Sequence, residues 1–129
     1  EVGYNYRMPN LNAALGVAQL ENIELFIKQK RLLANKYHKW GDSNDVTFVK
    51  ESNHTLSNYW LNTILTKDVA ERDIFLKKTN DENIMTRPAR TPMHLLQMND
   101  DCYSLSMENT EWLFDRIVNV PSSPILSEK

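Results

Sequence analysis

Four consecutive residues near the start of the chain, Tyr4, Asn5, Tyr6 and Arg7, place two phenols, an amide and a guanidinium just ahead of a long helical pattern. The N-terminal end of a helix attracts anions, because its unpaired backbone amides and its dipole both favour negative charge. Asn5 and Arg7 are therefore candidates for binding an anion. In the structural alternative, Tyr4 and Tyr6 bury their rings and Arg7 pairs with a nearby carboxylate, and composition alone favours this alternative.

Arg87 and His94 form a second candidate pair. Arg87 ends a predicted strand just before Pro88, so its side chain is expected at the edge of a sheet. His94 follows seven residues later, in a loop that Pro92 stiffens. An arginine offers two parallel donors to a phosphoryl group, so the pair suits a phosphate or pyrophosphate. A solvated arginine and an ordinary loop histidine are the alternative, which is favoured when the pair is considered alone.

The sequence argues against several other kinds of site. His38, His54 and His94 are scattered, and none has a thiolate or carboxylate at the close spacing of a metal-binding motif. Cys102 directly follows two aspartates, whose charges oppose thiolate formation and so disfavour a nucleophilic role. With three glycines in the chain there is no glycine-rich phosphate loop, and no serine-hydrolase motif occurs.

The composition is that of an ordinary globular domain. Fifteen Lys and Arg residues against 17 Asp and Glu residues give a net charge of −2, which lacks the basic excess of a nucleic-acid-binding protein. No apolar run approaches the roughly 20 residues of a membrane span. The single cysteine excludes an internal disulfide and fits a reducing compartment. We therefore expect a cytoplasmic domain with neither a nucleic-acid nor a membrane partner.

A long helix is predicted over residues 11–40, with Asn10 as its N-cap and Gly41 as its stop signal. Its first half is apolar on nearly all sides, whereas its second half has a single apolar stripe. The apolar residues of the first half are Leu11, Ala13, Ala14, Leu15, Val17, Ala18 and Leu20. This half is expected to pack against something outside the 129 residues. Because the chain begins at Glu1 with its most polar loop, we expect a piece of a longer protein, cut on its N-terminal side.

After residue 41 the pattern changes to short strands and helices. Asp68 and Glu71 have the spacing of a capping box at the start of a helix over 69–79, and Ser106 is the predicted cap of a last helix over 107–116. Strands are predicted at 46–49, 59–66, 84–87 and 117–120, with a loop containing one helical turn at 88–102. The predicted class is α/β in the α+β sense: a long N-terminal helix, then a small, mostly antiparallel sheet with helices on one face.

The motifs together resemble a known enzyme family. The stretch GYNYRMPNLNAALGVAQLE closely resembles the signature of the DegT-type sugar-nucleotide aminotransferases, which are pyridoxal-phosphate enzymes of fold type I. The similarity continues through SNYWLNTIL, MTRPARTPMH and EWLFDRIVNVPSS, and it covers nearly all of residues 1–123. The pattern resembles the branch that aminates nucleotide-linked 4-keto-6-deoxy sugars in legionaminic-acid-like pathways. Ala89 and Arg90 depart from it, since a bulky apolar or aromatic residue is expected after the proline.

The resemblance implies that the chain is the C-terminal portion of such an enzyme, with residues 1–41 as the active-site loop and interdomain helix and 42–129 as a small α/β domain. The Schiff-base lysine would lie before Glu1, so no catalytic residue is assigned here. Asn5 would reach the cofactor phosphate of the neighbouring subunit in a homodimer with shared active sites. The implied substrate-binding residues are Tyr4, Tyr6, Arg7, Arg87 and His94.

The whole enzyme would transfer an amino group from glutamate to C4 of the keto sugar for surface glycan synthesis, and this portion would be inactive alone. Pyridoxal 5'-phosphate would be bound mainly by the N-terminal domain. The competing hypothesis is a non-catalytic α/β module for dimerisation or ligand sensing that uses the same fold. A Schiff-base lysine upstream in the full protein would exclude it.

Overall fold

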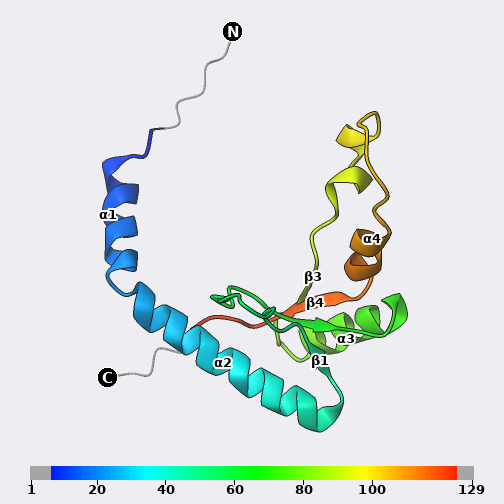
Figure 1. Cartoon of the computed structure of the whole chain (residues 1–129), viewed down its shortest axis with the longest axis horizontal. Coiled ribbons are helices and arrows are strands. Elements are labelled where there is room, and N and C mark those ends of the chain that lie inside the picture. The colour runs from blue at the N-terminus through cyan, green and yellow to red at the C-terminus, as the bar shows by residue number, and fades with distance from the viewer. Residues whose placement is uncertain (1–6, 125–129) are drawn as a thin grey trace.

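The structure, a computed structural model, describes residues 7–124, and its elements follow the predicted order (Figure 1). The helices are α1 (Asn10–Leu20), α2 (Ile23–Asn44), α3 (Val69–Asp81) and α4 (Glu108–Phe114). The strands are β1 (Thr47–Phe48), β2 (Asn62–Leu65), β3 (Arg87–Pro88) and β4 (Ile117–Val120). Two 3₁₀ turns, η1 (Met93–Leu95) and η2 (Gln97–Asn99), lie between β3 and α4. The predicted fold class is confirmed.

The sheet has four strands in the order β1-β2-β4-β3, and every neighbouring pair is antiparallel. Phe48, Ile64 and Val118 are register partners across β1, β2 and β4, so their side chains form one row on one face. Tyr37 of α2 and Phe75 of α3 pack against this row. Both helices therefore cover the same face, as the sequence predicted.

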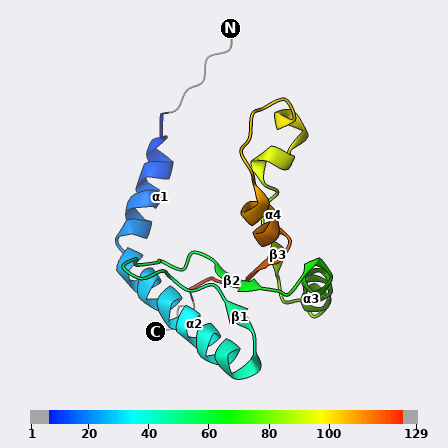
Figure 2. The same cartoon turned by 45° about the vertical axis from the view of Figure 1, so that its right-hand side comes forward.

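The predicted continuous helix is interrupted at residues 21 and 22. The Asn22 side chain donates from Nδ2 to the carbonyl oxygen of Ala18 at 3.0 Å, and its backbone N–H donates to the carbonyl of Gln19 at 3.2 Å. Asparagine side chains compete in this way with the regular helical ladder. Figures 1 and 2 show the consequence, a change of direction between α1 and α2.

Helix α1 has no buried residue, and both views show it extending away from the sheet (Figures 1 and 2). Leu11 is 80% exposed and Leu20 is 66% exposed, although these are the apolar positions expected to pack. The interpretation that α1 packs against a further part of the protein stays a prediction. None of the helices described is both long and apolar enough to cross a bilayer.

Gly41 does not end α2, contrary to the sequence prediction. The helix continues to Asn44 and is capped by Asp45, which adopts the left-handed conformation at φ 56° and donates its backbone N–H to the Gly41 carbonyl. Gly41 is instead buried against β1, where an added Cβ would lie 2.5 Å from the Val46 carbonyl oxygen and 2.7 Å from the Phe48 ring. Its role is to permit close approach of helix and strand.

The predicted Asp68 cap of α3 is confirmed, but the Glu71 side chain bonds one residue before the cap, to Lys67, and not to Asp68 itself. The Asp68 carboxylate accepts the backbone N–H of Glu71 at 2.9 Å, and the Glu71 carboxylate accepts the N–H of Lys67 at 2.6 Å. Neither of the other predicted caps is formed. Asn10 lies inside the first turn of α1 after Pro9, and α4 follows residue 107 without a side-chain cap.

Strand β3 also differs from its prediction, because pairing covers Arg87 and Pro88 and not residues 84–86. β3 is an edge strand, which is where a sheet tolerates a proline.

Replacing Gly41 by alanine is expected to lower the free energy of unfolding by about 1–3 kcal/mol, because the new methyl group overlaps a backbone oxygen and a buried ring. The matched control is Gly16→Ala in α1, where nothing lies within 4 Å of the added Cβ. That change should raise stability by up to about 1 kcal/mol through helix propensity. Urea unfolding of both variants measures the two effects. If the two variants change the free energy of unfolding equally, the close approach of α2 to β1 does not require glycine at position 41.

Candidate functional site

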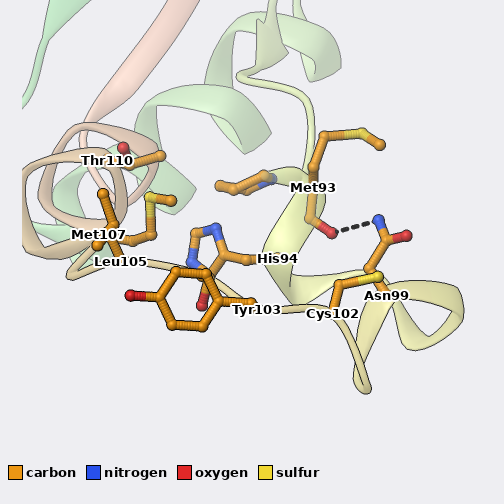
Figure 3. A pocket seen from close by; sticks show the side chains of 10 residues that line it. Met93, His94, Asn99, Cys102, Tyr103, Leu105, Met107 and Thr110 are labelled. Carbon is orange, nitrogen blue, oxygen red and sulfur yellow. Dashed lines mark hydrogen bonds between the residues drawn. The ribbon is translucent and has the colours of Figure 1, made fainter.

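A pocket of about 590 Å³ lies between the 3₁₀ turns and the start of α4 (Figure 3). Its walls combine apolar side chains with neutral hydrogen-bonding groups. The lining residues are Pro92, Met93, His94, Asn99, Cys102, Tyr103, Ser104, Leu105, Met107 and Thr110. Small-molecule sites commonly combine an apolar lining with a few polar groups in this way.

The pocket wall is built from successive tight turns. The Leu95 N–H donates to the Pro92 carbonyl at 3.0 Å, and the Cys102 N–H donates to the Asn99 carbonyl at 2.9 Å. The Asn99 side chain at the end of η2 links it to η1 by donating from Nδ2 to the Met93 carbonyl at 2.8 Å, the dashed line in Figure 3. The predicted loop is thus an ordered segment with two helical turns instead of one.

His94 is the predicted site residue that the structure places in this pocket. Its Nε2 lies 2.9 Å from Oε1 of Glu111 in α4, seventeen residues further along the chain. The His94 side chain is 16% exposed and that of Glu111 is 52% exposed. The pair ties η1 to α4 and fixes the ring, a contact that sequence reasoning missed.

Arg87 does not line this pocket. It is exposed on the edge strand β3, where its Nη2 lies 3.4 Å from the sulfur of Met85. Its backbone position is held by pairing with Asn119 of β4. The guanidinium therefore faces solvent at the sheet edge, while His94 sits inside the pocket wall.

The predicted N-terminal site is only partly covered by the structure. Arg7 is exposed just ahead of α1. Tyr4, Asn5 and Tyr6 lie outside the described residues, so their predicted roles stay predictions. Within residues 7–124 no three His, Cys, Asp or Glu side chains are grouped closely enough to hold a metal ion.

Comparison with known proteins decides the family. The model of the DegT/DnrJ/EryC1/StrS aminotransferase family matches residues 1–129, the whole chain. The chain belongs to this family. The resemblance of the sequence motifs is thereby confirmed at the family level, while the legionaminic-type branch is not.

Individual members of the family extend well beyond this chain. GDP-perosamine synthase from Escherichia coli O157:H7 is 39% identical over 131 residues, which cover 99% of this chain and 35% of that protein. EpsN from Bacillus subtilis (strain 168), provisionally named a pyridoxal phosphate-dependent aminotransferase, is 33% identical over 134 residues, with 99% and 34% covered. The chain spans about a third of the length of these relatives.

A solved family structure has the same fold. Helicobacter pylori PseC, described as an aminotransferase involved in the biosynthesis of pseudoaminic acid, matches with a TM-score of 0.85 at 18% identity. The match covers 98% of this chain and 35% of that chain. At this level of identity the likeness establishes the fold alone.

The pocket around His94 does not fit pyridoxal phosphate, because that cofactor needs a lysine amine and none of the lining residues is a lysine. Lys30 has a pKa lowered by burial, but its Nζ donates to the carbonyls of Trp60 at 3.1 Å and Ser122 at 2.7 Å. It thereby holds two loops against α2. The pocket lining therefore has no amine for the cofactor, and the Lys30 amine is engaged by two backbone carbonyls.

A second ordered region, which sequence reasoning missed, is the loop after β1. Arg31 of α2 forms a two-pronged ion pair with Glu51, with N–O distances of 2.8 and 3.1 Å, and also donates to the Ser57 carbonyl. The Ser57 N–H donates to Glu51 at 2.7 Å, and the guanidinium lies 5.5 Å from the centre of the Tyr59 ring. The cluster holds the loop in which Trp60 is 68% exposed.

Hydrogen bonds from Arg31, and then from the Ser57 backbone, lower the pKa of Glu51 from the ordinary 4.5 to about 2. Because the folded value is depressed, the pair stabilises the fold fully above pH 4.5 and is lost as the pH falls towards about 2. The difference in free energy of unfolding between wild type and Glu51→Gln should therefore shrink across this window.

Denaturant unfolding from pH 7 to about pH 2 measures this difference. Asp42→Asn is the control, because Asp42 and its partner Lys50 are 66% and 53% exposed. An exposed pair of this kind contributes little at any pH. Parallel stability curves for wild type and Glu51→Gln would contradict the assigned pKa.

Proposed function

We propose that the protein is a pyridoxal-phosphate-dependent sugar-nucleotide aminotransferase and that these 129 residues form its C-terminal part. It transfers an amino group from glutamate to the C4 keto group of a nucleotide-linked 4-keto-6-deoxy sugar for surface glycan synthesis. The observation that carries the proposal is the family match over the whole chain, together with 39% identity to an enzyme named GDP-perosamine synthase. That name favours a GDP-linked sugar.

In this proposal residues 1–41 form the active-site loop and interdomain helix, and 42–129 form the small domain. The exposed apolar side chains of α1 support it, because surfaces of this kind are usually buried against a partner. Leu15 is 63% and Val17 is 56% exposed. The partner proposed is the cofactor-bearing domain of a homodimer with shared active sites.

The residues of this chain bind and orient the substrates. The Arg87 guanidinium, exposed at the sheet edge, donates two parallel hydrogen bonds to a phosphoryl group of the nucleotide. His94 contacts the ligand from the pocket wall, while Tyr4, Tyr6 and Arg7 line the site. Asn5 reaches the cofactor phosphate across the subunit interface. When bound, the cofactor supplies the electron sink and carries the amino group between the two substrates.

The proposal is tested on the full-length protein by visible absorption after addition of pyridoxal phosphate. Glutamate should abolish the absorbance of the bound cofactor, and a GDP-linked 4-keto-6-deoxy sugar should restore it. Mass spectrometry should then show a nucleotide-linked amino sugar. If neither the spectrum nor the product is seen, the non-catalytic module is the correct interpretation.

Arg87→Lys is expected to raise the KM for the keto sugar nucleotide about tenfold. The lysine ammonium cannot make both parallel hydrogen bonds of the guanidinium, and losing one charge-assisted hydrogen bond costs about 1.5 kcal/mol. Glutamate has no nucleotide, so the reaction with glutamate alone should keep its wild-type rate. Arg90→Lys, at an exposed loop position, is the matched control. If both half-reactions slow together, Arg87 acts on the fold or the cofactor and not on the nucleotide.

Asn5→Ala in the full-length protein should weaken cofactor retention by tenfold to a hundredfold, the effect of losing one hydrogen bond to a charged phosphate, about 1.5–3 kcal/mol. Dialysis followed by absorbance measurement determines the loss. Mixing this variant with one that lacks the Schiff-base lysine should restore a fraction of the sites, because the contact crosses subunits. Absence of restoration would place Asn5 against its own subunit's cofactor.

A further inference from the structure

The contact between His94 and Glu111 determines which nitrogen of the His94 ring carries a proton. An ionised carboxylate only accepts hydrogen bonds, so Nε2, at 2.9 Å from the Glu111 oxygen, must be the donor. In the neutral ring Nδ1 then has a lone pair and no proton. Among the residues described, Nε2 has this one hydrogen-bond partner and Nδ1 has none. The polar atom that His94 leaves for a ligand is therefore an acceptor.

The rest of the pocket has matching chemistry. None of its ten lining residues is a lysine, arginine, aspartate or glutamate. The charged residues next to the lining residues are acidic. Asp100 and Asp101 are exposed and directly precede Cys102, and the Glu111 carboxylate contacts His94. Among the lining residues a phosphate would meet no lysine or arginine. Hydroxyl groups would meet the His94 acceptor, Ser104 and Thr110, and an apolar sugar face would meet Tyr103.

We propose that Glu111 is a positioning residue that orients His94 with Nδ1 as acceptor, and that the pocket consequently takes a neutral hydroxyl-bearing sugar group and excludes phosphate. This deepens the proposed function and rests on it for the identity of the substrate. It also revises the role expected from sequence, in which His94 and Arg87 together would bind a phosphate or pyrophosphate. Arg87, outside this pocket, remains the candidate for the phosphate.

The tautomer is measured directly by long-range proton–nitrogen NMR of the full-length protein labelled with ¹⁵N-histidine, at about pH 8, where an ordinary imidazole is neutral. Nε2 of His94 should resonate as a protonated nitrogen and Nδ1 as an unprotonated one. The opposite assignment would overturn the proposal. His94→Gln identifies the signals by their disappearance.

Glu111→Ala should convert His94 to a mixture of tautomers. Glu111→Gln should give an intermediate result, because an amide oxygen still accepts from Nε2 while the amide nitrogen can donate to it. Glu108→Gln is the matched control, since Glu108 is an exposed acid of the same helix, one turn earlier. It should leave the spectrum unchanged. A tautomer that stays unaltered in Glu111→Ala would show that Glu111 does not position the ring.

Ligand preference is tested by titrating the labelled protein with a neutral methyl 6-deoxyhexopyranoside and, separately, with inorganic phosphate. The glycoside should shift the Nδ1 resonance of His94 and phosphate should not. A shift caused by phosphate, or no shift with the glycoside, would overturn the assigned ligand class. In turnover, Glu111→Ala should raise the KM for the sugar nucleotide several-fold and leave the KM for glutamate unchanged.

The two proposals fail in different ways. If the full-length protein transfers no amino group but the glycoside shifts His94 in wild type and not in Glu111→Ala, the proposed function is wrong and the pocket assignment holds. If amino transfer is observed but the KM for the sugar nucleotide is the same in Glu111→Ala as in wild type, the pocket assignment is wrong and the proposed function holds.

Discussion

The close approach of α2 to β1 at Gly41 is the constraint on which the rest of the structure depends. Without a side chain there, helix and strand come near enough for the rings of Tyr37 and Phe48 to stack, with centroids 5.3 Å apart. Phe48 begins the row of side chains that ends at the fully buried Val118 of β4. The Tyr37 hydroxyl also donates to the Pro121 carbonyl at 3.0 Å, so the chain leaving β4 is tied back to the same helix. The absence of a side chain at Gly41 thus allows the sheet to pack closely against α2.

The pocket takes its position from this frame through α3 and α4. Arg72 of α3 donates to the Phe114 carbonyl at 3.1 Å, and its guanidinium lies 5.8 Å from the centre of the Phe114 ring. This fixes the end of α4, whose Glu111 holds His94. The segment that carries η1, η2 and the pocket is therefore held at one end by strand β3 and at the other by α4, which is joined to α3. Loops that carry binding residues commonly rely on such rigid supports.

Sequence reasoning succeeds here where the controlling interactions are local. Asp68 and Glu71 are three residues apart, and the Asp68 side chain accepts the Glu71 N–H as an N-cap does. It fails where a side chain competes with the backbone, as Asn22 does, or where tertiary contact decides, as at Gly41. The order of helices and strands could be predicted from the periodicity of apolar residues. The break of the long helix at Asn22 and the packing role of Gly41 could not.

In the candidate site too, single residues could be predicted from the sequence but their tertiary partners could not. His94 was recognisable as a polar residue in a proline-stiffened loop, but its partner Glu111 lies 17 residues away on another element, and Arg31 lies 20 residues from Glu51. No spacing rule connects such pairs, since only the fold brings them together.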